Sequence, residues 1–434
     1  MTGPLPLGIR THPRHRVAEE ARVVAMIALN GWAADIRDGR EAHALLEAAV
    51  ALDRWVSLGL GFERDSRGGR RFDIAEVVNF AKGPAPLRGD TTAERFVRQQ
   101  RALALGHFSA GTLSDPPPSP ELLPPAQFEV TLVRELASAN ASDGGSQFLR
   151  LPMPIEGPAL RDVLFDLLPP PGVEPDVALN PGHLDIRIRT AAAVDVRCGV
   201  RWSFVCDPAS ATQASHPLDG HERDRWTMPD EGLVKVSDRV RALAVEIAGE
   251  EKDAGNLVQR FFDHAIDCLW SGVLHYDEFD VDEPIDRLLD GGWGDSRMGA
   301  ALVVALCRAR GIPARLVAGF ALDPACPSER CWLEAWIDGR GWTSWDVLAS
   351  DLSANGRDAA WRAYCAGRVG YRMKTRILPD GAALMPGVLL PPAWYTMTRA
   401  SGDGVEIATF DVATGEVLCT DRLVVRRTDP MGAA

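Results

Sequence analysis

The chain has 434 residues, of which 46% are hydrophobic and 25% charged, a composition typical of a folded protein of about two to four domains. Its formal net charge of −13 argues against binding to nucleic acid or anionic membranes, because both need basic patches. No apolar run approaches the roughly 20 residues that span a bilayer, and the N-terminal sequence lacks a signal-peptide pattern, so we expect a cytoplasmic protein. The eight scattered cysteines suit reduced, buried thiols better than a disulfide framework.

Residues 15–106 are predicted to be helical because apolar residues recur at three- and four-residue spacing, as in "REAHALLEAAVALDRWVSLG". The proline-rich stretch 114–125 cannot continue a helix and predicts an extended linker. We therefore expect a helical N-terminal region with its linker over residues 1–125.

From residue 126 the hydrophobic period changes to two. "QFEVTLVREL", "GHLDIRIRTA" and "VDVRCGVRWSFV" alternate apolar and polar residues, and Gly, Pro, Asn and Asp separate such stretches. This pattern predicts a β-sandwich-like domain over residues 126–230, which ends in a polar loop.

Residues 231–434 mix helical and strand patterns. "SDRVRALAVEIAG" and "AGNLVQRFFDHAIDCLW" predict helices, and Asp295 and Ser296 are both suited to cap a third helix. Gly311 suits the end of that helix, and Pro313 prevents its continuation. "ARLVAGFAL" then predicts a strand, "CWLEAWI" and "WTSWDVL" a hairpin, and further strands follow a short helix. The predicted fold class is α+β.

The motifs within residues 291–346 resemble the core of the transglutaminase-like superfamily, which has a papain-type fold. They are "GIPAR" after a helix, the Trp332 and Glu334 of a WxE motif, and a GWxxxD motif. Residues from 126 onwards are similar to bacterial members, including their N-terminal β domain, whereas the helical N-terminal region lies outside the resemblance. The resemblance therefore implies a transglutaminase-like core over residues 231–434, with C-terminal strands, behind a β-sandwich-like domain.

The family's chemistry is acyl transfer by a Cys–His–Asp triad, in which a thiolate at a helix N-terminus attacks an amide or ester. The resemblance places the nucleophile fifteen residues before the glycine of GIPAR, at Ser296. It places the base two residues before Trp332, at Arg330, and the orienting acid sixteen residues further on, at Asp346. Of the three positions, the aspartate alone keeps the family's residue type.

Serine and arginine change the chemistry that these positions offer. A serine hydroxyl needs a positioned base, and an arginine guanidinium does not deprotonate in proteins. All nine histidines lie at or before residue 275, with His264 and His275 nearest in sequence to the site. Cys331 is an alternative nucleophile, but it adjoins Arg330 on a strand, where successive side chains point to opposite faces.

The same residues also have structural interpretations. Ser296 is suited to cap its helix, and Arg330 and Asp346 to form a salt bridge between paired strands. The acidic run 276–283 lacks a glycine-containing calcium loop, and Cys326 and Cys331 lack a second pair of zinc ligands. We assign no metal and no cofactor.

Three functions follow, in order of preference. The first is a catalytically degenerate member that serves as a binding or scaffold module, with a protein partner or with an anion held by the helix N-terminus, Ser296 and Arg330. The second is an atypical acyl-transfer enzyme, an amide or ester hydrolase or ligase that uses Ser296 or Cys331 as its nucleophile. The third is nucleic-acid recognition, which the acidic charge disfavours.

Overall fold

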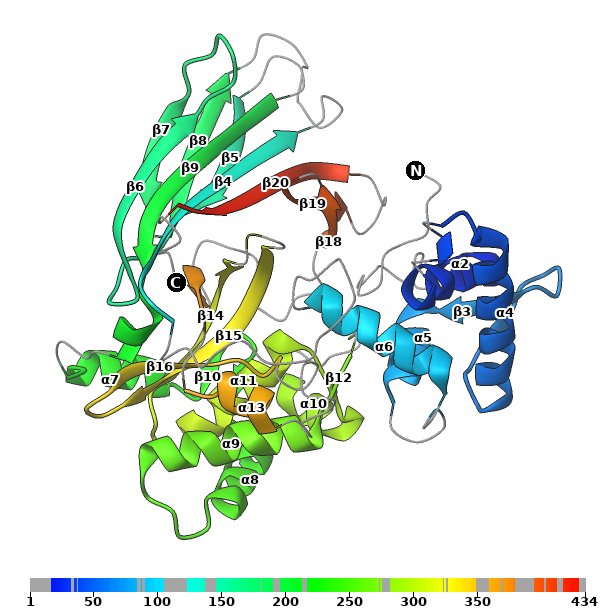
Figure 1. Ribbon diagram of the computed structural model, residues 1–434. Coiled ribbons are helices and arrows are strands. Elements are labelled where there is room, and N and C mark those ends of the chain that lie inside the picture. The colour runs from blue at the N-terminus through cyan, green and yellow to red at the C-terminus, as the bar shows by residue number, and fades with distance from the viewer. Residues whose placement is uncertain are drawn as a thin grey trace.

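The computed structural model divides the chain into three regions, each with a hydrophobic core of its own (Figure 1). The structure describes residues 17–32, 35–36, 38–83, 87, 90–104, 123–136, 146–180, 182–189, 196–212, 217–272, 274, 282–322, 324, 327–348, 359–367, 370–378, 394–401, 403–411 and 417–428. Within these ranges, no helix combines the length and apolar character that crossing a bilayer requires.

The N-terminal region consists of helices around a small antiparallel sheet. Its helices are α2 (Glu20–Gly31), α4 (Glu41–Ser57), α5 (Ile74–Lys82) and α6 (Thr91–Ala104). Its strands, in the sheet order β1-β3-β2, are β1 (Val17–Glu19), β3 (Arg70–Asp73) and β2 (Glu63–Arg64). Trp55, Phe72 and Phe96 are fully buried between these elements, so the region has a core that does not depend on the rest of the chain. The periodicity of residues 15–106 predicts its helices but not the sheet, whose strands are short.

The second region is a sandwich of a six-stranded and a three-stranded sheet (Figure 1). The larger sheet has the order β18-β19-β20-β4-β9-β6, and the smaller one the order β5-β8-β7. The strands are β4 (Ala126–Leu136), β5 (Ser146–Pro152), β6 (Leu160–Leu168), β7 (Asp176–Asn180), β8 (His183–Arg189), β9 (Val196–Cys206), β18 (Trp394–Ser401), β19 (Gly404–Asp411) and β20 (Val417–Arg427). Buried and exposed residues alternate along β4 and β8, as a half-buried strand requires.

The last three strands of the chain belong to this sandwich. β20 pairs antiparallel with β4, with Thr420 opposite Glu135, and β19 and β18 extend the sheet outward. The Arg134 guanidinium donates to both oxygens of Asp421, at 2.7 and 2.6 Å, and fixes this pairing. Here the structure differs from the expected division, which attached the C-terminal strands to the core over residues 231–434. Periodicity identifies a strand but not the distant partner to which it hydrogen-bonds.

The third region packs helices against a four-stranded sheet of order β16-β15-β14-β17. These strands are β14 (Ala314–Ala321), β15 (Ser328–Ile337), β16 (Gly341–Trp345) and β17 (Arg372–Leu378). The helices are the 3-10 turn η3 (Pro208–Thr212), α7 (Gly220–Thr227), α8 (Asp238–Ala248), α9 (Ala254–Cys268), α10 (Pro284–Gly291), α11 (Ser296–Ala309) and α13 (Ala359–Tyr364). Two short ribbons complete it: β10 (Asp230–Glu231) with β11 (Val234–Lys235), and β12 (Trp270–Ser271) with β13 (Trp293–Gly294).

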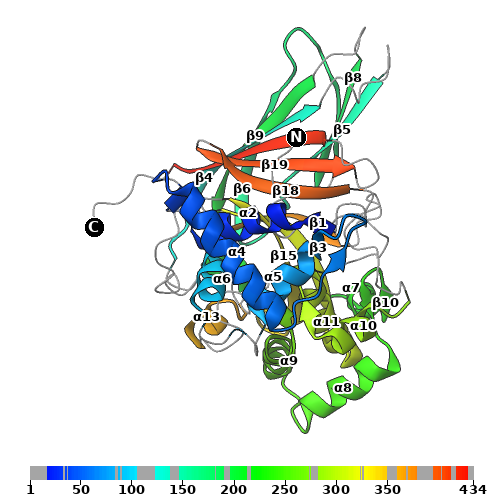
Figure 2. The ribbon, with the colours of Figure 1, turned by 90° about the vertical axis from the view of Figure 1, so that its right-hand side faces the viewer.

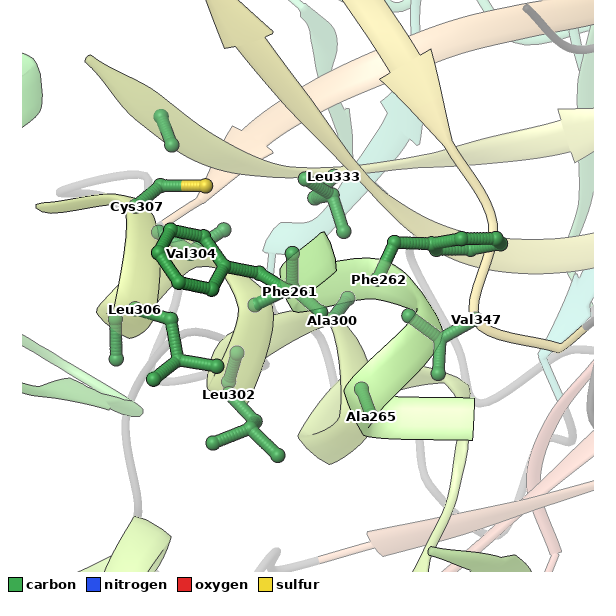
Figure 3. Close-up of a cluster of buried hydrophobic side chains, with 14 of the residues drawn as sticks. Phe261, Phe262, Ala265, Ala300, Leu302, Val304, Leu306, Cys307, Leu333 and Val347 are labelled. Atoms are coloured by element: carbon green, nitrogen blue, oxygen red, sulfur yellow. The ribbon is translucent and has the colours of Figure 1, made fainter. Parts of the chain in front are cut away.

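Helix α11 is the centre of this region. Every residue from Met298 to Arg308 is buried, because the sheet covers one side of the helix while α8 and α9 cover others. Figure 3 shows Ala300 and Val304 of α11 among Phe261, Phe262 and Leu333 of the surrounding elements. A helix that is apolar all round is stable only when it is enclosed in this way, so its first residue has a fixed position at the edge of the core.

We predict that the Arg134–Asp421 pair stabilises the sandwich. Substituting Asp421→Ala leaves Arg134 partly buried without its carboxylate and should lower the free energy of unfolding by roughly 3 kcal/mol. Asp403→Ala, which removes the exposed partner of Arg422 and Arg426, is the matched control and should cost less than about 1 kcal/mol. Urea titration of both variants measures the difference, and equal losses would contradict the assignment of β20 to this sheet.

Candidate functional site

Ser296 is the first residue of α11, and Asp295 is its N-cap. The Asp295 carboxylate accepts hydrogen bonds from the backbone N–H groups of Arg297 and Met298, at 3.0 and 2.8 Å. Of the two residues suited to cap this helix, the aspartate therefore does so. Ser296 is half-buried, and its hydroxyl has no hydrogen bond to any residue that the structure describes.

Asp346 follows β16 and is almost completely buried, with 2% of its surface exposed. Its Oδ2 accepts a hydrogen bond from Nη2 of Arg372 at 2.5 Å, and its Oδ1 accepts one from the backbone N–H of Leu348 at 2.9 Å. Burial lowers the pKa of the Arg372 guanidinium, but the Asp346 carboxylate raises it by more, so Arg372 stays charged. Both oxygens of the aspartate are therefore engaged by the protein itself.

The partner of Asp346 differs from the one that the sequence predicts. The proposed salt bridge joined Asp346 to Arg330, whereas the structure pairs it with Arg372 at the start of β17. Arg330 lies on β15 opposite Gly319 of β14. The Arg372 guanidinium also lies 5.2 Å from the ring centroid of Trp332, in cation–π contact.

The buried residue Cys365 lies directly beside Asp346, whose backbone N–H donates to the Cys365 carbonyl at 3.0 Å. Burial raises the pKa of Cys365 far above its usual value, and the Asp346 charge raises it further, whereas Arg372 and Arg330 lower it. The thiol of Cys365 therefore stays protonated in this position.

Packing brings the first turn of α11 to Asp346. A Cβ atom added to Gly299 would lie 2.7 Å from Cγ1 of Val347, closer than real contacts allow. Gly299 is one helical turn beyond Ser296, and Val347 directly follows Asp346. The glycine therefore lets Val347, in the segment after β16, lie against the first turn of α11.

Cys331 faces away from this site. It is buried in the core cluster that includes Leu333 and Ala335 of the same strand and the apolar residues of α11. Successive residues of a strand point to opposite faces, so Arg330 and Trp332 lie on the other side of β15. In this position the Cys331 thiol is a small apolar core group.

The described histidines lie elsewhere. They are His43 on α4, His183 on β8, His221 on α7 and His264 on α9. The pKa of His264 is lowered by burial, against the opposing charges of Asp267 and of Glu246 on α8. His264 is part of α9, and His275 lies outside the described residues. Nor do three His, Cys, Asp or Glu side chains gather as a metal site would anywhere in the described ranges.

The residues of the GIPAR, WxE and GW motifs form a separate cluster on the sheet. Arg315 of GIPAR donates two hydrogen bonds to Oε2 of Glu334, at 2.9 and 2.7 Å, and Lys374 donates to both carboxylate oxygens. The Arg315 guanidinium lies 3.8 Å from the ring centroid of Trp342. Burial raises the pKa of Glu334, but Lys374 and Arg315 lower it by more, to about 2. GIPAR, WxE and GW are thus three parts of one structural cluster that joins β14, β15, β16 and β17.

Arg372 and Lys374 are the site residues that sequence reasoning missed. Both come from β17, which follows a stretch of sequence without a recognisable motif. A single basic residue in a strand does not indicate which residue it pairs with. The alternation in "RMKTRIL", with basic residues at every second position, is the one feature that indicates a polar face on this strand.

Comparison with known proteins assigns the third region to a family. Residues 241–347 match the Transglutaminase-like superfamily (Transglut_core), so the chain contains a transglutaminase-like domain, as the motif spacing predicts. No curated protein matches the chain.

Solved structures show remote likenesses. A candidate cysteine protease from Cytophaga hutchinsonii is 16% identical, with 70% of this chain and 99% of that chain covered and a TM-score of 0.38. The periplasmic domain of TgpA from Pseudomonas aeruginosa is 18% identical, with coverage of 56% and 93% and a TM-score of 0.30. Red sea bream transglutaminase is 10% identical, with coverage of 72% and 73% and a TM-score of 0.25. These likenesses are too remote to bear on the activity of this chain.

We predict that Glu334 makes the stability of the domain depend on pH. Its folded pKa, about 2, is below the ordinary 4.5, so its contribution is complete above about pH 4.5 and is lost as the pH falls toward 2. Glu334→Gln should lower the free energy of unfolding by roughly 3 kcal/mol at pH 7, and this deficit should shrink across that window.

Denaturant titrations at a series of pH values measure this difference. Glu329→Gln, on the same strand with an exposed carboxylate paired to Arg376, is the control and should show a deficit below about 1 kcal/mol at pH 7. A Glu334→Gln deficit of constant size from pH 7 to pH 2 would refute the role given to this carboxylate.

Proposed function

We propose that this chain is a transglutaminase-like protein that has lost acyl-transfer catalysis and uses the region around Ser296, Arg330 and Asp346 to bind an anionic ligand. The supporting observation is the partner of Asp346, which is the guanidinium of Arg372 at 2.5 Å. An aspartate that is neutralised by an arginine does not orient a base, and the residue at the base position, Arg330, cannot accept a proton.

The nucleophile position leads to the same proposal. The pKa of an alcohol is far above neutral, so Ser296 needs a neighbouring base to attack an acyl group. Among the described carboxylates of this region, Asp346 is engaged by Arg372 and Leu348, and Asp295 caps the helix. Neither carboxylate is available to take the proton from Ser296.

Two features favour an anion as the ligand, with a carboxylate or a phosphate as its class. Arg330 and Arg372 bring two permanent positive charges to the site. In addition, Nη1 of Arg372 and Nε1 of Trp332 are buried donors without a hydrogen-bond partner, and such donors are costly unless an acceptor reaches them. Asp295 already satisfies two backbone N–H groups of α11, so the arginines carry more of the attraction than the helix N-terminus.

The proposed setting is the cytoplasm, with a protein partner or a small anion as the bound species. The seven cysteines that the structure describes form no disulfide, and five of them are buried, which suits a reducing compartment. The net charge of −13 gives no support to a nucleic-acid partner.

Isothermal titration calorimetry with acetate, succinate and inorganic phosphate tests the proposal. We expect at least one of the three to bind the wild type, and Arg330→Ala to weaken that binding by about 10- to 100-fold, as loss of a charge-assisted hydrogen bond does. Arg376→Ala, an arginine of the same sheet that pairs with Glu329, is the matched control and should bind as the wild type does. Equal affinities of wild type and Arg330→Ala would contradict the anion site.

A second candidate function is an atypical acyl transferase, an amide or ester hydrolase or ligase. It is favoured by the half-buried Ser296 hydroxyl, which has no hydrogen-bond partner in the described part of the chain. Cys331, the other nucleophile weighed from the sequence, lies in the core of the domain. Treatment with a fluorophosphonate and with an acyl-thiol probe, followed by peptide mass spectrometry, should leave both residues unmodified. Stoichiometric, selective modification of Ser296 that disappears in Ser296→Ala, or of Cys331, would establish this function instead.

A further inference from the structure

The N-terminal region touches the transglutaminase-like domain at the ribbon that leads to Ser296. The contact is made by Asn79, near the C-terminal end of α5, and by Gly272, which follows β12. A Cβ atom added to Gly272 would lie 2.3 Å from Oδ1 of Asn79 and 2.6 Å from Cε3 of Trp293. Only a glycine leaves room for this carboxamide, so Gly272 and Trp293 form a notch that Asn79 occupies.

A second contact supports the first. Gly83, the C-cap of α5, lies with its Cβ position 4.0 Å from Cζ2 of Trp293. On its other side, Trp293 packs against Trp270 of the neighbouring strand, with ring centroids 6.2 Å apart. Trp293 is therefore held between its own domain and the end of α5 (Figure 1).

This contact is next to the nucleophile position in the fold. The backbone N–H of Gly272 donates to the carbonyl of Gly294 at 2.8 Å, which continues the parallel pairing of β12 with β13. Gly294 is two residues before Ser296, and Asp295 between them caps α11. Any motion of α5 relative to the notch thus takes place directly beside the start of α11.

The N-terminal region has a hydrophobic core of its own. Its buried side chains, such as Trp55, Phe72 and Phe96, pack among themselves, separately from the cores of the other two regions. Residues 105–125, which include the proline-rich sequence, join it to β4. Figure 2 shows the helices of this unit in front of the transglutaminase-like domain and below the strands β18 and β19.

We propose that the N-terminal helical unit is a cap over the Ser296 site, held closed by Asn79 in the notch of Gly272 and Trp293. A reversible latch is consistent with these contacts, because an amide side chain against glycine backbone leaves polar groups that water satisfies when the cap opens. Access to Ser296 then depends on the opening of the cap. The inference rests on the proposed function only in that Ser296 belongs to the ligand site, and its test needs no ligand.

A reporter thiol at the site measures access directly. Ser296→Cys is alkylated with iodoacetamide, and the rate of modification at residue 296 is followed by peptide mass spectrometry, which separates it from the native cysteines. In the same background, Gly272→Ala adds a Cβ atom where the Asn79 carboxamide and the Trp293 ring lie, and so forces the cap away from the notch. We expect this variant to speed alkylation at position 296 by at least about tenfold.

A substitution on the other side of the contact opens the cap without crowding the notch. Asn79→Ala removes the latch side chain and should speed alkylation at position 296 severalfold. Glu76→Ala, an exposed position on the same helix, is the matched control and should leave the rate unchanged. An alkylation rate that Gly272→Ala or Asn79→Ala leaves unchanged overturns the cap. Loss of anion binding in calorimetry would leave these rates as they are, so the two proposals fail separately.

Discussion

The buried ion pair between Arg372 and Asp346 is the constraint on which the site depends. A carboxylate with 2% exposure is unstable unless opposite charge and hydrogen bonds compensate its lost hydration. Arg372 provides both from β17, and the ring of Trp332 lies under its guanidinium. The charge of Asp346 therefore stabilises an arginine that is permanently protonated. A histidine in the same place would exchange protons with a nucleophile, and an arginine does not.

The contrast with the neighbouring cluster is informative, because both are buried charge networks on the same sheet. Arg315, Glu334 and Lys374 join three strands, and Trp342 covers them, so these motif residues support the scaffold. This structural role does not require a nucleophile in the domain. The motif residues that match the family therefore belong to the scaffold, and the proposed loss of catalysis concerns Ser296 and Arg330, which lie outside this cluster. Matching a family by such letters identifies the architecture and leaves the activity to be decided at the site.

The sequence predicts the core of the domain well, and for a physical reason. Helix α11 begins at its aspartate cap and ends before Pro313, and the hairpin of β15 and β16 follows from two apolar runs around a glycine turn. These features are local, whereas the three triad positions that the motif spacing gives stay a prediction. The partner of Asp346 is not local, because Arg372 reaches it from a strand at the far edge of the sheet.

The same limit explains the other differences. Two contacts join residues that are far apart in the chain: the pairing of β20 with β4, and the packing of Asn79 against Gly272. Neither contact produces a periodic pattern in the sequence. A glycine that is needed for a close approach looks, in the sequence, like any other glycine in a loop. Composition, periodicity and spacing therefore indicate which elements form, and the contacts between distant elements decide what the site can do.

The central claim is that Asp346 is committed to Arg372, and a double-mutant cycle on stability tests it most directly. The free energy of unfolding is measured for the wild type, Asp346→Asn, Arg372→Met and the double variant. Removing one partner leaves the other charge buried, so each single variant should lose roughly 3–5 kcal/mol, and the double variant should lose no more than either single one. Losses that add, with no coupling between the two positions, would contradict the account.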